Sequence, residues 1–120
     1  MNRILIAEDE KRLAAFIEKG LRKHGFTTDV AADGQQALQK AVNEEFQLVL
    51  LDLGLPITDG WTVLKELRAQ GEKFPIIIVT ALNDDGNQTA ALNLGANDFV
   101  TKPFKFSDLI AKVKYHLNQN

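Results

Sequence analysis

Short apolar runs alternate with longer amphipathic segments five times along this chain, and this alternation constrains the fold more than any other feature. The apolar runs have the length of buried strands, and the segments between them have the periodicity of helices. Strands are predicted over residues 3–7, 26–31, 46–52, 75–80 and 97–101. Helices are predicted over residues 10–24, 34–44, 58–70, 84–94 and 105–118.

Strand–helix alternation predicts parallel strands, because two parallel neighbours need a crossover connection. Five such units are too few to close an eight-stranded barrel, so the sheet should be open. The predicted class is α/β: a five-stranded parallel sheet of order 2-1-3-4-5 with helices on both faces, a flavodoxin-like doubly wound (βα)5 fold. A length of 120 residues suits a single domain spanning residues 1–120.

Local signals place several helix ends. Gly25 is positioned to end the first helix, while Asp33 and Ser107 are predicted to cap the second and the last. The segment 84–94 contains few apolar residues, so that helix is expected to be loosely held and free to move.

Composition excludes several classes of function. A net charge of −2 without a basic cluster gives no support for a nucleic-acid or anionic-membrane surface. The absence of Cys excludes disulfides, thiolate metal sites and a Cys nucleophile, and it fits a reducing compartment. No segment has the apolar length of a signal peptide or a membrane span, so a cytoplasmic protein is expected.

Polar residues stand where four of the predicted strands end. Glu8 and Asp9 follow the first strand, Asp52 ends the third, Thr80 ends the fourth, and Lys102 follows the fifth. Because the carboxyl ends of parallel strands share one edge, these side chains should converge where open α/β sheets bind ligands. The first and third strands flank the topological switch point, which should bring Asp9 and Asp52 side by side.

These residue types match the needs of phosphoryl transfer. Carboxylates gathered without Cys or a nearby His suit a hard cation such as Mg²⁺. Lys102 adds a mobile positive charge and Thr80 a hydroxyl donor, so phosphoryl oxygens could be neutralised and held. A carboxylate can also be the nucleophile, giving an aspartyl-phosphate, and Asp52 at the end of a rigid strand is the best candidate.

Taken singly, each residue has a structural alternative. Glu8 and Asp9 could begin a helix, Thr80 could be a strand residue, and Lys102 could be a solvated lysine. Their joint placement is what favours a site.

Four further residues are interpreted structurally. His24 and His116 lie near helix ends, which favours capping or surface roles. Phe16 and Trp61 are expected in core or half-buried packing. No glycine-rich phosphate loop or dinucleotide fingerprint is present.

With these residues in view, the chain resembles the receiver domain of bacterial two-component response regulators. The likeness is carried by ILIAEDE (4–10), LVLLDLGLPITDGW (48–61), PIIIVTA (75–81) and LGANDFVTKPF (94–104), in the same order and spacing. It covers essentially the whole chain and is greatest to the subfamily with winged-helix DNA-binding effectors.

The resemblance implies a role for each acid. Asp52 would accept a phosphoryl group from a sensor histidine kinase or from a small donor such as acetyl phosphate. Asp9 would bind Mg²⁺ directly and Glu8 through water, while Asp52 and the Gly54 carbonyl would complete the protein's ligands.

It also implies a switch. Thr80 and Lys102 would each bond a phosphoryl oxygen, and the Lys102–Pro103 peptide bond would be cis. Phosphorylation would draw in Thr80, move the fourth helix and turn Phe99 inward.

The implied function is a signalling switch whose fourth-helix/fifth-strand/fifth-helix face controls an effector domain or downstream protein in transcription. It would catalyse its own phosphorylation and dephosphorylation but would not be a turnover enzyme, and it would touch neither nucleic acid nor membrane itself. Three alternatives stay open: a stand-alone receiver acting by protein contact or phosphorelay, a Mg²⁺-dependent aspartyl-phosphate phosphohydrolase, and a phosphorylation-independent interaction module. Gly54 argues against the phosphohydrolase, which would carry a second acid at that position.

The chain departs from the family pattern on this face. Phe99 stands where Tyr is common and lacks its hydroxyl. Asn97 replaces an Asp that often supports dimerisation, and Lys112 or Lys114 replaces an Arg. Since Lys is a poorer bidentate partner than Arg, a phosphorylation-dependent homodimer through this face has less support.

The residues two positions after Asp52 and Thr80 are Gly54 and Leu82. Neither offers an acid or amide that could orient an attacking water. A long-lived phosphoryl group is therefore expected.

Overall fold

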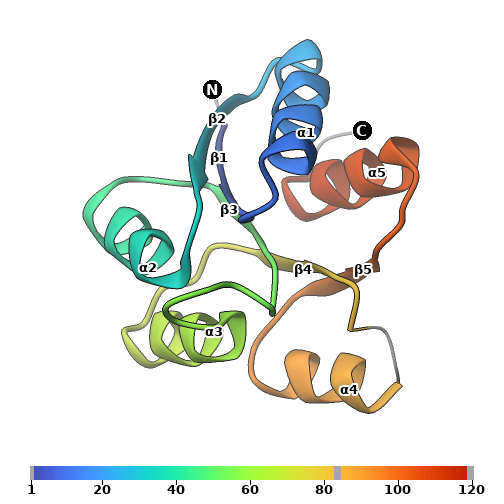
Figure 1. The fold of residues 1–120 in the computed structure, drawn as a ribbon. Helices are drawn as coiled ribbons and strands as arrows, with labels where there is room; N and C mark the ends of the chain where they lie inside the picture. The colour runs from blue at the N-terminus through green and yellow to red at the C-terminus, as the bar shows by residue number, and fades with distance from the viewer. Residues whose placement is uncertain (1, 83–84, 119–120) are drawn as a thin grey trace.

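The computed structural model of this chain describes residues 2–82 and 85–118. Its five strands pair in parallel in the order β2-β1-β3-β4-β5, which confirms the predicted sheet (Figure 1). The strands are β1 (Arg3–Ala7), β2 (Thr27–Ala31), β3 (Leu48–Leu51), β4 (Ile76–Thr80) and β5 (Asp98–Thr101).

Helices cover both faces of the sheet, with α1 and α5 on one face and α2, α3 and α4 on the other (Figure 1). The helices are α1 (Lys11–Lys23), α2 (Gly34–Asn43), α3 (Gly60–Ala69), α4 (Asp85–Asn93) and α5 (Phe106–His116). None of the helices in the described ranges has the length and hydropathy to cross a membrane.

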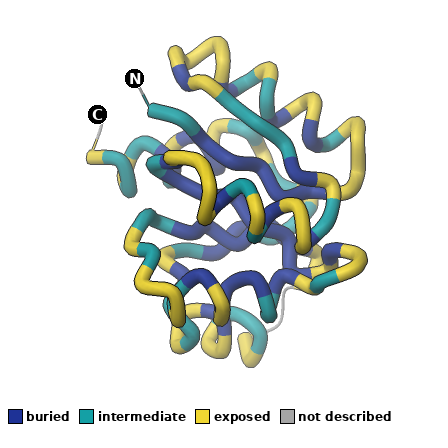
Figure 2. The backbone as a smooth tube through the Cα atoms, turned by 90° about the vertical axis from the view of Figure 1, so that its left-hand side faces the viewer, coloured by how far each residue is buried: buried dark blue, intermediate teal, exposed yellow. Residues whose placement is uncertain are grey.

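Two apolar layers sandwich the sheet, and β3 contributes to both. Leu48 and Leu50 pack in the layer under α1 and α5, while Val49 and Leu51 pack under the other three helices. Successive strand side chains point to opposite faces, so a strand buried on both faces needs an unbroken apolar run. The buried strands lie in the interior, and the exposed residues lie on the outer sides of the helices and in the loops (Figure 2).

Most predicted helix ends are confirmed to within two residues. Gly25 follows α1 with a φ of 88°, which glycine adopts without strain, and Asp33 caps α2 by accepting the Gln36 N–H (2.8 Å). The prediction that Ser107 caps α5 is wrong. Lys105 stands at the cap with an extended backbone, and Ser107 lies inside the helix. Residue 84, the predicted start of the fourth helix, lies outside the described residues.

The prediction of core or half-buried packing is wrong for Phe16. Its side chain is 52% exposed on α1, where its ring edge contacts Phe106 (centroids 5.9 Å apart). Helical periodicity predicts which face a residue shares, but not where the packed layer stops. Trp61 is half-buried against the core, in agreement with the prediction.

Arg68, near the end of α3, connects α4 to the rest of the fold. Its guanidinium donates to the main-chain oxygens of Gly95 (2.9 Å), Glu72 (2.8 Å) and Phe74 (2.9 Å), and to Oδ1 of Asn97 (2.9 Å). Asn97, which the resemblance associates with a dimer face, is thus bonded within the chain. Ala91 is the one buried residue of α4, so the bonds from Arg68 to Gly95 and Asn97, just after the helix, help to hold its end in place.

We expect Arg68→Ala to lower the free energy of unfolding by about 2–3 kcal/mol, because it leaves several carbonyl groups without a charged donor. Arg68→Lys should restore only part of the lost stability, since one ammonium cannot reach all four oxygens that the guanidinium contacts. Urea unfolding measures both variants. The control is Arg22→Ala, which removes an exposed pair with Glu18 and should cost less than about 1 kcal/mol. Equal losses for Arg22→Ala and Arg68→Ala would contradict the anchoring role.

Asp98, the first residue of β5, joins the strand to α5. Its Oδ1 accepts Lys112 Nζ (3.0 Å), and its Oδ2 lies 2.9 Å from His116 Nε2. The expected surface or capping role of His116 is wrong: its side chain is only 14% exposed, because the last turn of α5 lies over β5. His24 is exposed, as predicted.

Asp98 is expected to make stability depend on pH. Burial alone would raise the pKa of its carboxyl, but the bonds with His116 and Lys112 outweigh burial and hold the pKa below its ordinary 3.8. The ionised form therefore stabilises the folded state, fully above the ordinary pKa and less as pH falls below it. Asp98→Asn should thus be less stable than the native chain near neutral pH, with a difference that shrinks between roughly pH 5 and 2. Urea unfolding across that range tests this, and a constant difference would contradict it.

Candidate functional site

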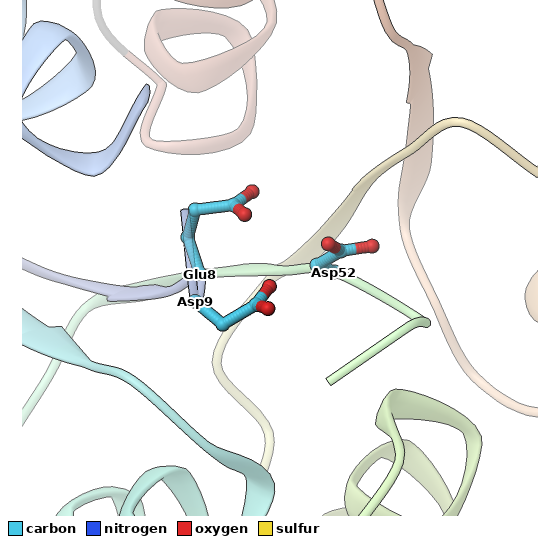
Figure 3. A group of neighbouring side chains, drawn as sticks. All are labelled: Glu8, Asp9 and Asp52. Carbon is cyan, nitrogen blue, oxygen red and sulfur yellow. The ribbon is translucent and has the colours of Figure 1, made fainter. Parts of the chain in front are cut away.

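Three carboxylates meet at the carboxyl edge of the sheet. Glu8 and Asp9 follow β1, and Asp52 follows β3, its neighbour in the sheet. One oxygen of each lies within 4.8 Å of the others (Figure 3). The predicted juxtaposition of Asp9 and Asp52 is therefore present in the structure.

The three acids differ in burial. Glu8 is 4% exposed and Asp52 is 8% exposed, whereas Asp9 faces solvent. Burial raises the pKa of the Glu8 carboxyl, although the ammonium of Lys102 and the N–H of Glu10 act in the opposite direction. Neighbouring residues at a strand end point to opposite sides, which explains why one acid is enclosed and the next is open.

Lys102 bridges the two buried acids. Its Nζ lies 2.7 Å from Glu8 Oε1 and 3.0 Å from Asp52 Oδ2. Burial would lower the pKa of this ammonium, but its bonds to the two carboxylates outweigh burial and raise it, so Lys102 is charged. The residue is positioned by its backbone N–H, which donates to the Thr80 carbonyl (2.9 Å), and the Lys102–Pro103 peptide bond is cis.

Backbone groups orient the carboxylates. The N–H of Gly54 donates to Asp52 Oδ1 (3.1 Å), and the N–H of Glu10 donates to Glu8 Oε2 (3.1 Å). The role of Glu10 was not predicted, because a main-chain donor leaves no signal in residue type.

The two expected switch residues are buried. Thr80 ends β4 and is 1% exposed, and its hydroxyl oxygen accepts the Leu82 N–H at 3.4 Å. Phe99 lies in β5 beside Ile78 and packs in the layer under α2, α3 and α4. The structure therefore already has the inward position of Phe99 that the resemblance assigned to the phosphorylated form.

The site suits a hard cation and a phosphoryl group. The donor set of Glu8, Asp9 and Asp52 contains only oxygen, which Mg²⁺ prefers. Three carboxylates and one ammonium leave an excess of negative charge that a divalent cation would neutralise. Asp52 has one oxygen held by Gly54 and one paired with Lys102, so it is fixed in place as a nucleophile would need to be.

Comparison with known proteins agrees with this geometry. Residues 4–114 match the family model of the response regulator receiver domain. The transcriptional activator protein IrlR of Burkholderia pseudomallei is 45% identical over 112 residues, which make up 93% of this chain and 48% of that protein. The chain therefore spans about half the length of this curated relative.

Two solved structures are similar over nearly the whole chain. The receiver domain of the Francisella response regulator 1452 has a TM-score of 0.95 and 34% identity, covering 98% of both chains. The receiver domain of the sensor histidine kinase PA1611 from Pseudomonas aeruginosa has a TM-score of 0.89 and 33% identity, covering 98% of both chains. That structure holds a magnesium ion in its active site cleft.

Proposed function

This chain belongs to the family of response regulator receiver domains, and we propose on that basis that it is a phosphorylation-controlled switch with Asp52 as the phosphoacceptor. The observation that supports this most directly is the position of Asp52, which is nearly buried, bonded by Gly54 and paired with Lys102. We propose that residues 1–120 form one receiver domain.

Each residue of the site then has a role. An oxygen of Asp52 attacks the donor's phosphorus, and a new phosphorus–oxygen bond forms as the bond to the donor breaks and its electron pair leaves with the donor. Lys102 neutralises one phosphoryl oxygen, and Thr80 donates its hydroxyl hydrogen to another.

The acids would also hold Mg²⁺. Asp9 and Asp52 would be direct ligands, Glu8 would act through water, and the Gly54 carbonyl would complete the set. When bound, Mg²⁺ would neutralise charge on the phosphoryl oxygens during transfer.

The partners follow from the same proposal. The donor would be a sensor histidine kinase, and the output would be control of transcription, through an effector domain or a downstream protein, in the cytoplasm. The likeness to a transcriptional activator supports this output. A homodimer through the α4–β5–α5 face has weaker support, because Asp98 and Asn97 are already bonded within the chain.

Phosphorylation by a small donor tests the proposal. Incubation with acetyl phosphate and Mg²⁺ should add the mass of one phosphoryl group, and peptide mapping should place it on Asp52. Chelation of Mg²⁺ should prevent the addition. A wild-type chain that gains no mass under these conditions would favour the phosphorylation-independent interaction module, and steady turnover of phosphate esters would favour the phosphohydrolase.

The phosphoryl group is expected to be long-lived. The exposed Leu82 side chain and Gly54 provide no group to orient water at the site. A Cβ on Gly54 would have Asp52 Oδ1 as its nearest neighbour at 3.9 Å, so Gly54→Asn fits and should shorten the lifetime by about tenfold or more. Loss of phosphate after donor removal measures this. Decay of the wild-type phosphoprotein within seconds would reject the expectation.

A further inference from the structure

Ile57 has a backbone conformation that its own side chain disfavours. Its φ is 69°, in the left-handed region, where a β-branched residue is strained. The N–H of Thr58 donates to the Pro56 carbonyl (2.8 Å), which closes a γ-turn with Ile57 at its centre. Glycine would adopt this conformation without strain, so the turn itself does not explain the isoleucine.

Neighbouring segments hold the turn in place. The Pro56 carbonyl also accepts the N–H of Gly34 (3.1 Å), the first residue of α2, and a Cβ on Gly34 would overlap the Thr58 carbonyl oxygen. At the other end of the loop, the N–H of Gly60 donates to the Leu53 carbonyl (2.9 Å). Because α2 and this loop both follow strands at the carboxyl edge, the turn lies on the rim of the Asp52 site.

The side chain of Ile57 contributes little to the fold. It is 77% exposed, the largest value among the large apolar residues in the described ranges. Two other exposed apolar side chains belong to segments that follow the carboxyl ends of β1 and β4. Leu82 follows Thr80, and Phe16 lines a groove of α1 together with Lys102. Exposed apolar side chains therefore occur on three of the segments that begin at this edge of the sheet.

We propose that Ile57 is a docking and specificity contact for the protein that donates the phosphoryl group. This rests on the proposed function, because a donor protein must bring a phosphohistidine to a carboxylate that is only 8% exposed, and in doing so it covers the rim. Strained residues persist where function requires them, and an apolar side chain held out on the rim gains from burial by a partner. A small donor reaches the carboxylate without needing that contact.

The test compares a protein donor with a small donor on Ile57→Gly and Ile57→Asn, both of which tolerate positive φ. The protein donor is the fastest of a panel of purified, ATP-autophosphorylated sensor histidine kinases, and the small donor is acetyl phosphate with Mg²⁺. The rate from the kinase divided by the rate from acetyl phosphate should fall about 10- to 100-fold in both variants, the factor that burial of one such side chain represents. The control is Val42→Ala. Val42 is an exposed apolar residue near the C-terminal end of α2, so its truncation should leave the ratio unchanged.

Stability gives an independent readout. The urea midpoint of Ile57→Gly should equal or exceed that of the native chain, because the strain is removed. Three results would each overturn the inference. The first is a ratio within about twofold of the native one, and the second is a clear loss of stability in Ile57→Gly. The third is a panel in which no kinase labels a chain that acetyl phosphate does label. Failure of the proposed function differs from all three, since the native chain would then be labelled by neither donor.

Discussion

Asp52→Asn is expected to abolish phosphorylation, whether the donor is acetyl phosphate or a histidine kinase. An amide keeps the size and hydrogen bonds of the side chain but cannot supply the nucleophilic oxygen, so no phosphorus–oxygen bond forms. Mass spectrometry after incubation with donor and Mg²⁺ should show the unmodified mass alone. The folded state should persist, because Asn can still accept the Gly54 N–H that Asp52 accepts at 3.1 Å.

Asp59→Asn is the matched control. Asp59 lies in the same loop and caps α3 by accepting the N–H of Thr62 (3.0 Å), and Asn caps a helix equally well. This variant should label like the native chain. Labelling of Asp52→Asn at the native rate would show that another residue is the acceptor.

Lys102→Met is expected to slow labelling by acetyl phosphate about 10²- to 10³-fold, the usual effect of removing one charged group that stabilises the transition state. Methionine fills a similar volume but leaves Glu8 and Asp52 without the ammonium that lies 2.7 Å and 3.0 Å from them. Initial rates of mass gain at fixed Mg²⁺ measure the effect. Lys102→Arg should recover part of the rate, since it restores the charge but not the compact ammonium.

An exposed lysine is the control for loss of charge. Lys65→Met changes the net charge equally on the surface of α3 and should label at the native rate. Equal slowing in Lys65→Met and Lys102→Met would mean that overall charge, rather than the contact with the two acids, governs the rate.

Much of the site could be predicted because the carboxyl ends of parallel strands lie at one edge of the sheet. Once β1, β3, β4 and β5 were identified by their apolar runs, their following residues had to share one edge. Together with neighbouring positions for the first and third strands, that rule predicts Asp9 beside Asp52. It could not show that Glu8 is enclosed while Asp9 is open, or that Lys102 pairs with both buried acids.

Several side chains outside the acid cluster also escaped prediction. His116 looked like a helix-end residue, yet it meets Asp98 across the β5–α5 contact. Asn97 bonds Arg68 from a position 29 residues away. Ile57 adopts a positive φ that its residue type disfavours, because Gly34 and Gly60 hold the surrounding loop.

The amino-acid order by itself determined the layered α/β fold and the edge at which the acids gather, because both depend on local periodicity and on the crossover that parallel strands require. Only the tertiary structure decided which polar atoms touch, which carboxylates lose contact with water, and which residue carries backbone strain. Those outcomes depend on distances between segments that are far apart in the chain, and such distances are set by packing rather than by any local pattern.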